Sequence, residues 1–262
     1  MCRVVGFAFA AALLAPQFAA AQMQPHRATY ALRLGTAINA PRIGTAVQDL
    51  TRDCTGWHLE RDITTEIALT TSWKISLESK LDGQEALSGN SFQYRTLQVQ
   101  NGSERETRGR VHRAAGEIRA EIVTPNGPYQ FVLPPPTLMP VAGMNYLIDR
   151  LDAQATSFPA LTFDAEVIGD AFLVDVTELD SGALRPAPPA EKTVAVPAVK
   201  SWPVAMTFTR GRQQDQRPLF SLDALVFATG VLDRLTVDTG LLKVAADLQA
   251  LDMHKSPVCP RS

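Results

Sequence analysis

Few apolar residues of the 262-residue sequence recur at helical spacing, and the sequence contains only three cysteines and four histidines. The scarcity of helical periodicity disfavours an all-α fold. Gly-x-Ser-x-Gly elbows, glycine-rich phosphate loops and His-Glu-x-x-His motifs are all missing, so the common signatures of hydrolases, nucleotide-binding proteins and zinc peptidases do not occur. No repeat of fixed period occurs, which argues against a propeller or a solenoid. We therefore expect a protein that is not an enzyme and that uses no cofactor or metal.

The four histidines are the remaining candidates for acid–base chemistry. His58 falls on the polar side of a predicted strand, and His26, His112 and His254 fall in charged or terminal segments. A paired general base would require the fold to bring two of them together. We expect solvated side chains instead.

Segment 1–21 has the three-part pattern of a secretory signal peptide, with Arg3, an apolar stretch and a small-residue site that ends at Ala21. The apolar stretch is too short to span a bilayer as a mature helix. Cleavage there would lower the basic residues from 25 to 24 against 27 acidic ones, a net charge of −3. A mature chain without a strong basic patch is not expected to bind nucleic acid. Residues 22–262 are predicted to form a single domain that does not span a membrane.

Two cysteines remain after cleavage, Cys54 and Cys259, and they are 205 positions apart. In an oxidising exported compartment, pairing is the default expectation for two such residues. Two unpaired buried thiols are the main alternative, and a metal site is the less favoured one.

The longest alternating stretch follows Cys54-Thr-Gly-Trp57. Odd positions from Trp57 to Leu69 are mostly apolar and even positions are polar, which predicts a strand with one dry face. A strand about twice the usual length is expected to bend across a curved sheet or to run the height of a barrel. Arg61 is the charged exception on the dry face. It is predicted either to pair with a carboxylate inside the curve, which we favour, or to mark the mouth of a cavity.

Shorter alternating segments predict the other strands, and the composition favours one large all-β domain of about fourteen strands with one helix. Asp82-Gly83 and Asn101-Gly102 are predicted turns. Charged segment 104–113 is predicted to be a solvated or edge strand, and proline-rich segment 185–197 an extended surface connection. The remaining predicted strands are 26–34, 43–52, 72–81, 91–99, 117–123, 129–133, 161–168, 171–179, 201–209, 219–227, 231–237 and 241–251.

One segment changes period from two to that of a helix. Its apolar residues recur on one side between Leu138 and Leu151, and Asp149, Arg150 and Asp152 lie on the other. A single amphipathic helix among strands most often plugs or caps a curved sheet, so we prefer this use to membrane binding. The predicted partners of its apolar stripe are Trp57, Ile63, Ile67, Trp73, Ile75 and Leu77.

Several short motifs occur in order along nearly the whole mature chain. They are His26-Arg-Ala-x-Tyr30, Cys54-x-Gly-Trp57, a proline-led helix after Leu133, Ser201-Trp-Pro-Val204, Thr229-Gly-Val231 and Pro257-Val-Cys259. Together they resemble the EipB-like family of alphaproteobacterial cell-envelope integrity proteins.

The resemblance implies a periplasmic protein folded as an open, spiral-like antiparallel β-barrel with a helix inside the curl. It also implies a disulfide between Cys54 and Cys259 and a role in envelope integrity, through a periplasmic tetratricopeptide-repeat partner. The chain departs from the family where Met139-Pro-Val-Ala-Gly143 replaces the usual Phe-Pro-Thr-x-His. A role that depends on that histidine is not expected here.

Two functional hypotheses follow, and they predict different interiors. An interaction protein of the envelope would have a core filled by the helix. A carrier of a lipid or another apolar ligand would have an apolar cavity of ligand size, open at one mouth.

Overall fold

A computed structural model describes residues 23–68, 74–166, 171–186, 194–197, 200–210 and 217–260. The predicted signal peptide, Leu69, Trp73 and the predicted turn at Gly169-Asp170 lie outside these residues. The described residues form fourteen strands and one helix, α1 (Pro140–Asp152). The strands are β1 (His26–Leu34), β2 (Arg42–Arg52), β3 (Gly56–Ala68), β4 (Lys74–Ala86), β5 (Ser91–Gln100), β6 (Ser103–Ala114), β7 (Glu117–Thr124), β8 (Gly127–Leu133), β9 (Ser157–Phe163), β10 (Ala171–Glu178), β11 (Ser201–Arg210), β12 (Phe220–Phe227), β13 (Leu232–Asp238) and β14 (Lys243–Met253).

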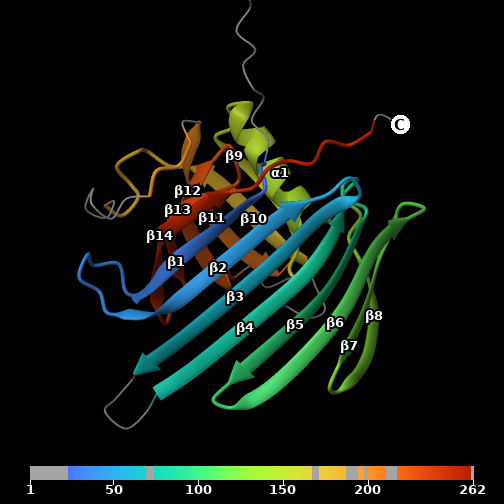
Figure 1. Cartoon of the computed structure of the whole chain (residues 1–262), viewed down its shortest axis with the longest axis horizontal. Coiled ribbons are helices and arrows are strands. Elements are labelled where there is room, and N and C mark those ends of the chain that lie inside the picture. Colours follow the sequence, from blue (N-terminus) through green and yellow to red (C-terminus); the bar gives the residue numbers. More distant parts are fainter. Residues whose placement is uncertain are drawn as a thin grey trace, which may run out of the picture.

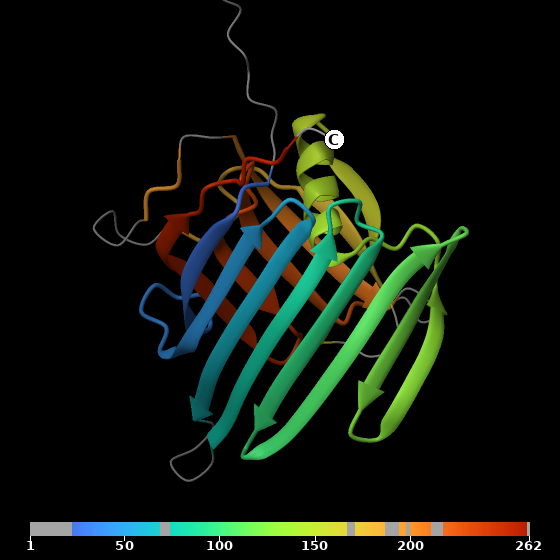
Figure 2. The ribbon, with the colours of Figure 1, turned by 45° about the vertical axis from the view of Figure 1, so that its right-hand side comes forward.

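All fourteen strands belong to one antiparallel sheet in the order β8-β7-β6-β5-β4-β3-β2-β1-β14-β13-β12-β11-β10-β9. The sheet curls so that its two halves face each other, with α1 between them near one end (Figures 1 and 2). Its outermost strands, β8 and β9, do not pair, so the barrel stays open. The predicted all-β fold, an open barrel of about fourteen strands with one internal helix, is confirmed.

The long strand predicted after Cys54 is β3, which pairs with β4 without a break from Gly56↔Ala86 to Ala68↔Lys74. The predicted turn at Asp82-Gly83 is wrong, because both residues lie within β4. Glycine at position 83 serves packing instead: a Cβ there would lie 2.7 Å from Cε2 of the Phe92 ring. The chain turns only after Ala86.

Two predictions were made for β6 and the turn before it, and they had different outcomes. Asn101-Gly102 is a turn, and both residues adopt positive φ, 50° and 81°. The charged segment 104–113 is not an edge strand, because β6 pairs with β5 on one side and β7 on the other. The other predicted alternative, a solvated strand, describes it: most of its charged side chains are exposed, although the strand is internal to the sheet.

The sheet has an inner face, which carries buried Trp57, Leu59, Leu81 and Phe92, and an outer face, which carries most of the charges. Helix α1 buries its apolar stripe against the inner face. Its buried residues are Val141, Gly143, Leu147, Ile148 and Leu151. The main core joins these side chains to residues of both halves of the sheet.

The predicted partners of the helix are partly wrong. Trp57 belongs to the core, but Ile63, Ile67, Ile75 and Leu77 are only half-buried and belong to neither apolar cluster of described residues. The helix starts beside β9, where Leu138 N–H donates to Leu161 O (2.7 Å) and Phe163 N–H donates to Leu138 O (2.8 Å). It therefore covers one end of the long strands, and these four side chains lie toward the other end.

Candidate functional site

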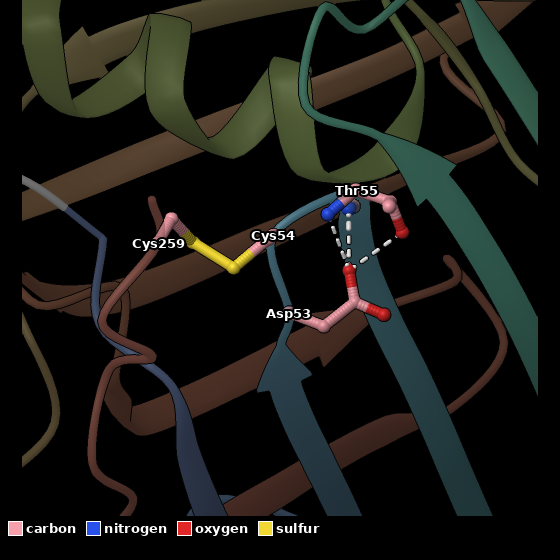
Figure 3. Close-up of a disulfide and its surroundings, with 5 residues drawn as sticks. Asp53, Cys54, Thr55 and Cys259 are labelled. Atoms are coloured by element: carbon pink, nitrogen blue, oxygen red, sulfur yellow. Dashed lines mark hydrogen bonds between the residues drawn. A yellow bond between two sulfur atoms is a disulfide. The ribbon is translucent and has the colours of Figure 1, made fainter. Parts of the chain in front are cut away.

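A disulfide joins Cys54, in the loop between β2 and β3, to Cys259 in the C-terminal segment (Figure 3). The two Cα atoms are 5.5 Å apart. Next to it, Asp53 Oδ1 accepts hydrogen bonds from Thr55 N–H (2.6 Å), Thr55 Oγ1 (2.7 Å) and Gly56 N–H (2.8 Å). These bonds, led by the one from the Thr55 hydroxyl, hold the pKa of Asp53 below its usual range. The bridge thus ties the C-terminal segment to a loop that is fixed by its own side chain.

A buried carboxylate holds the start of the helix. Glu85 of β4, only 3% exposed, accepts hydrogen bonds from Val141 N–H (2.7 Å) and Ala142 N–H (2.8 Å). The N-cap residue, Met139, provides no side-chain cap. Glu85 therefore supplies the cap from β4. Burial raises the pKa of Glu85 to about 7, although both N–H bonds favour the charged form.

Gly143 is the position at which the resemblance implies a histidine, and it lies where α1 approaches β9. A Cβ at this position would lie 3.2 Å from Cγ2 of Thr162. Glycine therefore allows a close approach between α1 and β9, and a side chain here would require the Thr162 methyl group to move by a few tenths of an ångström.

Two aromatic rings fill the inner face over glycines. The Tyr94 ring covers Gly109, where a Cβ would lie 2.3 Å from its Cε1 and Cζ atoms. Phe92 stacks beside Tyr94, with ring centroids 5.4 Å apart, and Phe163 of β9 contacts both. The Tyr94 hydroxyl is buried without a hydrogen-bond partner among the described residues. Burial raises the pKa of this hydroxyl.

Arg61 is paired inside the curl, the alternative favoured from the sequence. Its Nη2 lies 3.8 Å from Oε2 of Glu166, a residue after β9. Glu166 also accepts a hydrogen bond from the buried Ser79 hydroxyl. A carboxylate from one half of the sheet thereby bridges two strands of the other half. The Arg61 Nε atom is buried without a partner among the described residues.

The structure separates the histidines by environment. His26 is fully buried, contrary to the prediction, and burial lowers its pKa. It was misplaced because its position before Arg27 resembles a polar terminus, whereas the side chain shares the inner face with Leu50. His254 Nε2 lies 2.8 Å from Asp49 Oδ1. Asp49 Oδ2 also accepts a hydrogen bond from Arg27 Nη1 (2.9 Å), so this carboxylate is shared by two basic side chains.

His58 lies on the outer face, beside two acidic side chains. Its Nε2 lies 3.0 Å from Glu60 Oε1 and 3.7 Å from Asp82 Oδ1. Among the described residues, no group of three or more histidine, cysteine or acidic side chains is arranged to hold a metal ion.

A charged row on the outer face crosses six strands, from β1 to β6, at one level of the sheet. Register places its members opposite one another in the order Arg27, Asp49, Glu60, Asp82, Arg95 and Arg108. Three acidic residues are therefore followed by two basic ones. Depressions of about 400 Å³ and about 470 Å³ lie along the row, and both are lined by Asp82 and Arg95.

A second ionic network fixes the proline-rich segment. Asp247 of β14 is 5% exposed, and its carboxylate lies 2.5 Å from Arg185 Nη2 and 3.4 Å from Arg33 Nε. Arg185 also donates to Ala246 O at 2.8 Å. The predicted surface connection is therefore held at its start by a buried ion pair.

Comparison with known proteins identifies the family. The EipB-like profile matches residues 17–255. This chain belongs to the EipB-like family. The family and the structural relative below are not known to be enzymes. No helix among the described residues of this EipB-like protein is long and apolar enough to cross a membrane.

The EipB-like fold is also found in a solved structure. A β-barrel-like protein from Brucella abortus, assigned to a domain of unknown function, DUF1849, is similar with a TM-score of 0.77 and 20% sequence identity. The match covers 90% of this chain and 100% of that protein. A likeness at this identity concerns the fold alone. The search of curated proteins found no match.

Proposed function

We propose that this EipB-like protein is a non-enzymatic interaction protein of the periplasm that supports cell-envelope integrity, with a tetratricopeptide-repeat protein as its partner. The charged row on the outer face carries this proposal. Like charges directly opposite on neighbouring strands destabilise a sheet, and here Asp49 faces Glu60, Glu60 faces Asp82, and Arg95 faces Arg108. Ion pairs of Arg27 with Asp49, and of Glu106 with Arg95 and Arg108, offset part of this repulsion. A partner of complementary charge would offset more of it.

The interior supports the same proposal, because α1 fills the end of the curl that it occupies. Leu147, Ile148 and Leu151 lie in the main core with the rings of Phe92 and Phe163. A helix used as a plug leaves the outer face as the surface for recognition.

Capture of the partner from periplasmic extracts tests this proposal. Replacing the two adjacent arginines (Arg95→Glu with Arg108→Glu) reverses the charge at the basic end of the row. We therefore expect the captured tetratricopeptide-repeat protein to be lost, and the capture by the unaltered protein to weaken with salt. Lys74→Glu, at the far end of β4, is the matched control because Lys74 lies outside the row and pairs with exposed Glu66. Equal capture by all three proteins would contradict the proposal.

A carrier function is the second candidate, and one observation favours it. Ile63, Ile67, Ile75 and Leu77 form a half-buried apolar strip on the inner face beyond the main core. Such a strip suits an acyl chain or another apolar ligand. Native mass spectrometry of protein purified from the periplasm without detergent separates the two candidates. A bound lipid mass that disappears in Leu77→Lys would support the carrier, and a bound protein without lipid would support the interaction protein.

A further inference from the structure

Strand β8 is an open end of the sheet. It pairs with β7, and no described residue pairs along its other side. The opposite end is different, because Leu138 pairs with Thr162 and covers part of β9. β8 therefore presents backbone groups that another strand could use.

Proline identifies which backbone groups are free. Pro128 lies opposite Val123 and has no N–H, so it cannot belong to a hydrogen-bonded pair with β7. Hydrogen-bonded and non-hydrogen-bonded pairs alternate along an antiparallel ladder. Gly127, Tyr129, Phe131 and Leu133 consequently bond to β7. The backbone groups of Pro128, Gln130 and Val132 point away from the sheet.

The side chains of this edge do not discourage pairing. Natural edges are commonly protected by charged residues or by proline. β8 reads Gly-Pro-Tyr-Gln-Phe-Val-Leu and has no charged residue, and its one proline removes a single N–H donor but keeps a C=O that can accept. Tyr129 is 44% exposed and Val132 is 43% exposed, and neighbouring Val123 on β7 is 57% exposed. Apart from Gln130, the side chains of the edge are thus apolar on both of its faces.

We propose that β8 pairs antiparallel with β8 of a second copy of this chain, with Gln130 on the twofold axis. In this register Gln130 faces its own copy, Pro128 faces the partner's Val132, and Tyr129 faces the partner's Phe131. Every apolar residue then meets an apolar residue, and the single polar residue meets itself. This self-complementarity is what an isologous contact requires, and no charge on β8 selects a charged peptide instead.

The backbone groups complete the same register. Gln130 and the partner's Gln130 exchange two hydrogen bonds, and at each end Val132 N–H donates to the partner's Pro128 C=O, so about four bonds form. The contact is one strand wide, below the area of permanent dimers. The dimer is therefore reversible and depends on concentration. This inference goes beyond the proposed function and concerns a different surface from the charged row.

Sedimentation velocity of the purified mature protein over a dilution series tests the pairing. We expect reversible dimers in the unaltered protein. Gln130→Lys and Gln130→Glu should each be monomeric, because like charges then face each other across the axis. An equimolar mixture of the two variants should recover the dimer, since opposite charges meet. Gln93→Lys is the matched control: it lies on the outer face of internal strand β5 and should dimerise like the unaltered protein.

Gln130 is exposed in the monomer, so the variants should keep the circular dichroism spectrum and urea midpoint of the unaltered protein. A monomeric unaltered protein at every concentration would overturn the proposal. So would dimers in both single variants, or a mixture that stays monomeric. Partner capture is measured separately on the outer-face variants, so each proposal can fail without the other.

Discussion

Two buried tyrosines differ in a single hydrogen bond. The Tyr30 hydroxyl donates to Leu232 O at 3.1 Å, whereas the Tyr94 hydroxyl has no partner among the described residues. Burial raises the pKa of both groups, so both stay protonated at ordinary pH. Because an unpaired buried polar group costs free energy that a paired one recovers, the two hydroxyls should contribute to stability with opposite sign.

We expect Tyr94→Phe to leave the free energy of unfolding unchanged or to raise it by about 1 kcal/mol, because the variant removes an unpaired buried group. Tyr30→Phe, its matched control, should lower that free energy by about 1 kcal/mol through loss of the bond to Leu232. Urea unfolding of both variants measures the difference. Equal losses in the two would mean that Tyr94 has a partner.

Glu85 links stability to pH. Its pKa is about 7 in the fold and near the usual value in the unfolded chain, so between about pH 4.5 and 7 the folded state binds more protons. The contribution of Glu85 to stability is therefore full below pH 4.5 and is lost as the pH rises toward 7. A pKa difference of this size corresponds to about 3 kcal/mol.

Glu85→Gln cannot titrate, so we expect the stability advantage of the unaltered protein over this variant to shrink from pH 5 to pH 8. Urea unfolding of both proteins at the two pH values gives this double difference, in which other carboxylates cancel. Gln93→Glu, exposed on β5, controls for an added carboxylate and should show no such change. A constant difference would mean that the positive end of the helix offsets the burial of Glu85.

At the scale of elements, α1 decides how the two halves of the sheet meet. Pro140 begins the helix, which suits proline because the first helical N–H needs no partner. The apolar stripe of α1 then contributes to one core with both halves. The helix is therefore a structural part of the barrel.

Leu147 is 6% exposed in this core. Leu147→Ala should lower the free energy of unfolding by about 2–5 kcal/mol through lost burial and the cavity left behind. Asp149→Ala, on the exposed side of the same helix, should change it by less than about 0.5 kcal/mol. Urea unfolding compares the two. A small effect at Leu147 would show that the helix does not plug the sheet.

At the scale of the whole molecule, the disulfide closes a loop across a sequence separation of 205. Chain entropy assigns roughly 5 kcal/mol to such a loop, and measured gains are often smaller. We expect Cys259→Ser to lower the melting temperature, and thiol labelling of the denatured, non-reduced protein to find no free cysteine. Quantitative labelling of both Cys54 and Cys259 would contradict the bridge.

The sequence alone determined most of the strands, because the period of two that buries one face is local. It placed one wrongly: the strand predicted at 161–168 is β9, which begins at Ser157 and ends at Phe163. It gave β3, the Asn101-Gly102 turn and the helix nearly to their ends, and Arg61 stood out because a charge on a dry face needs a partner. The local signal at Asp82-Gly83 gave a wrong turn. In sequence, a glycine that makes room for a ring cannot be distinguished from a glycine in a turn.

Tertiary structure decided what no local pattern contains. Glu85 caps a helix 56 positions away in sequence, and Glu166 reaches Arg61 from the other half of the sheet. Register alone reveals the charged row, because its members come from six strands, and strand order alone makes β8 an edge. These features depend on which segments meet across the curl, and that is fixed by the packing of the whole sheet around α1.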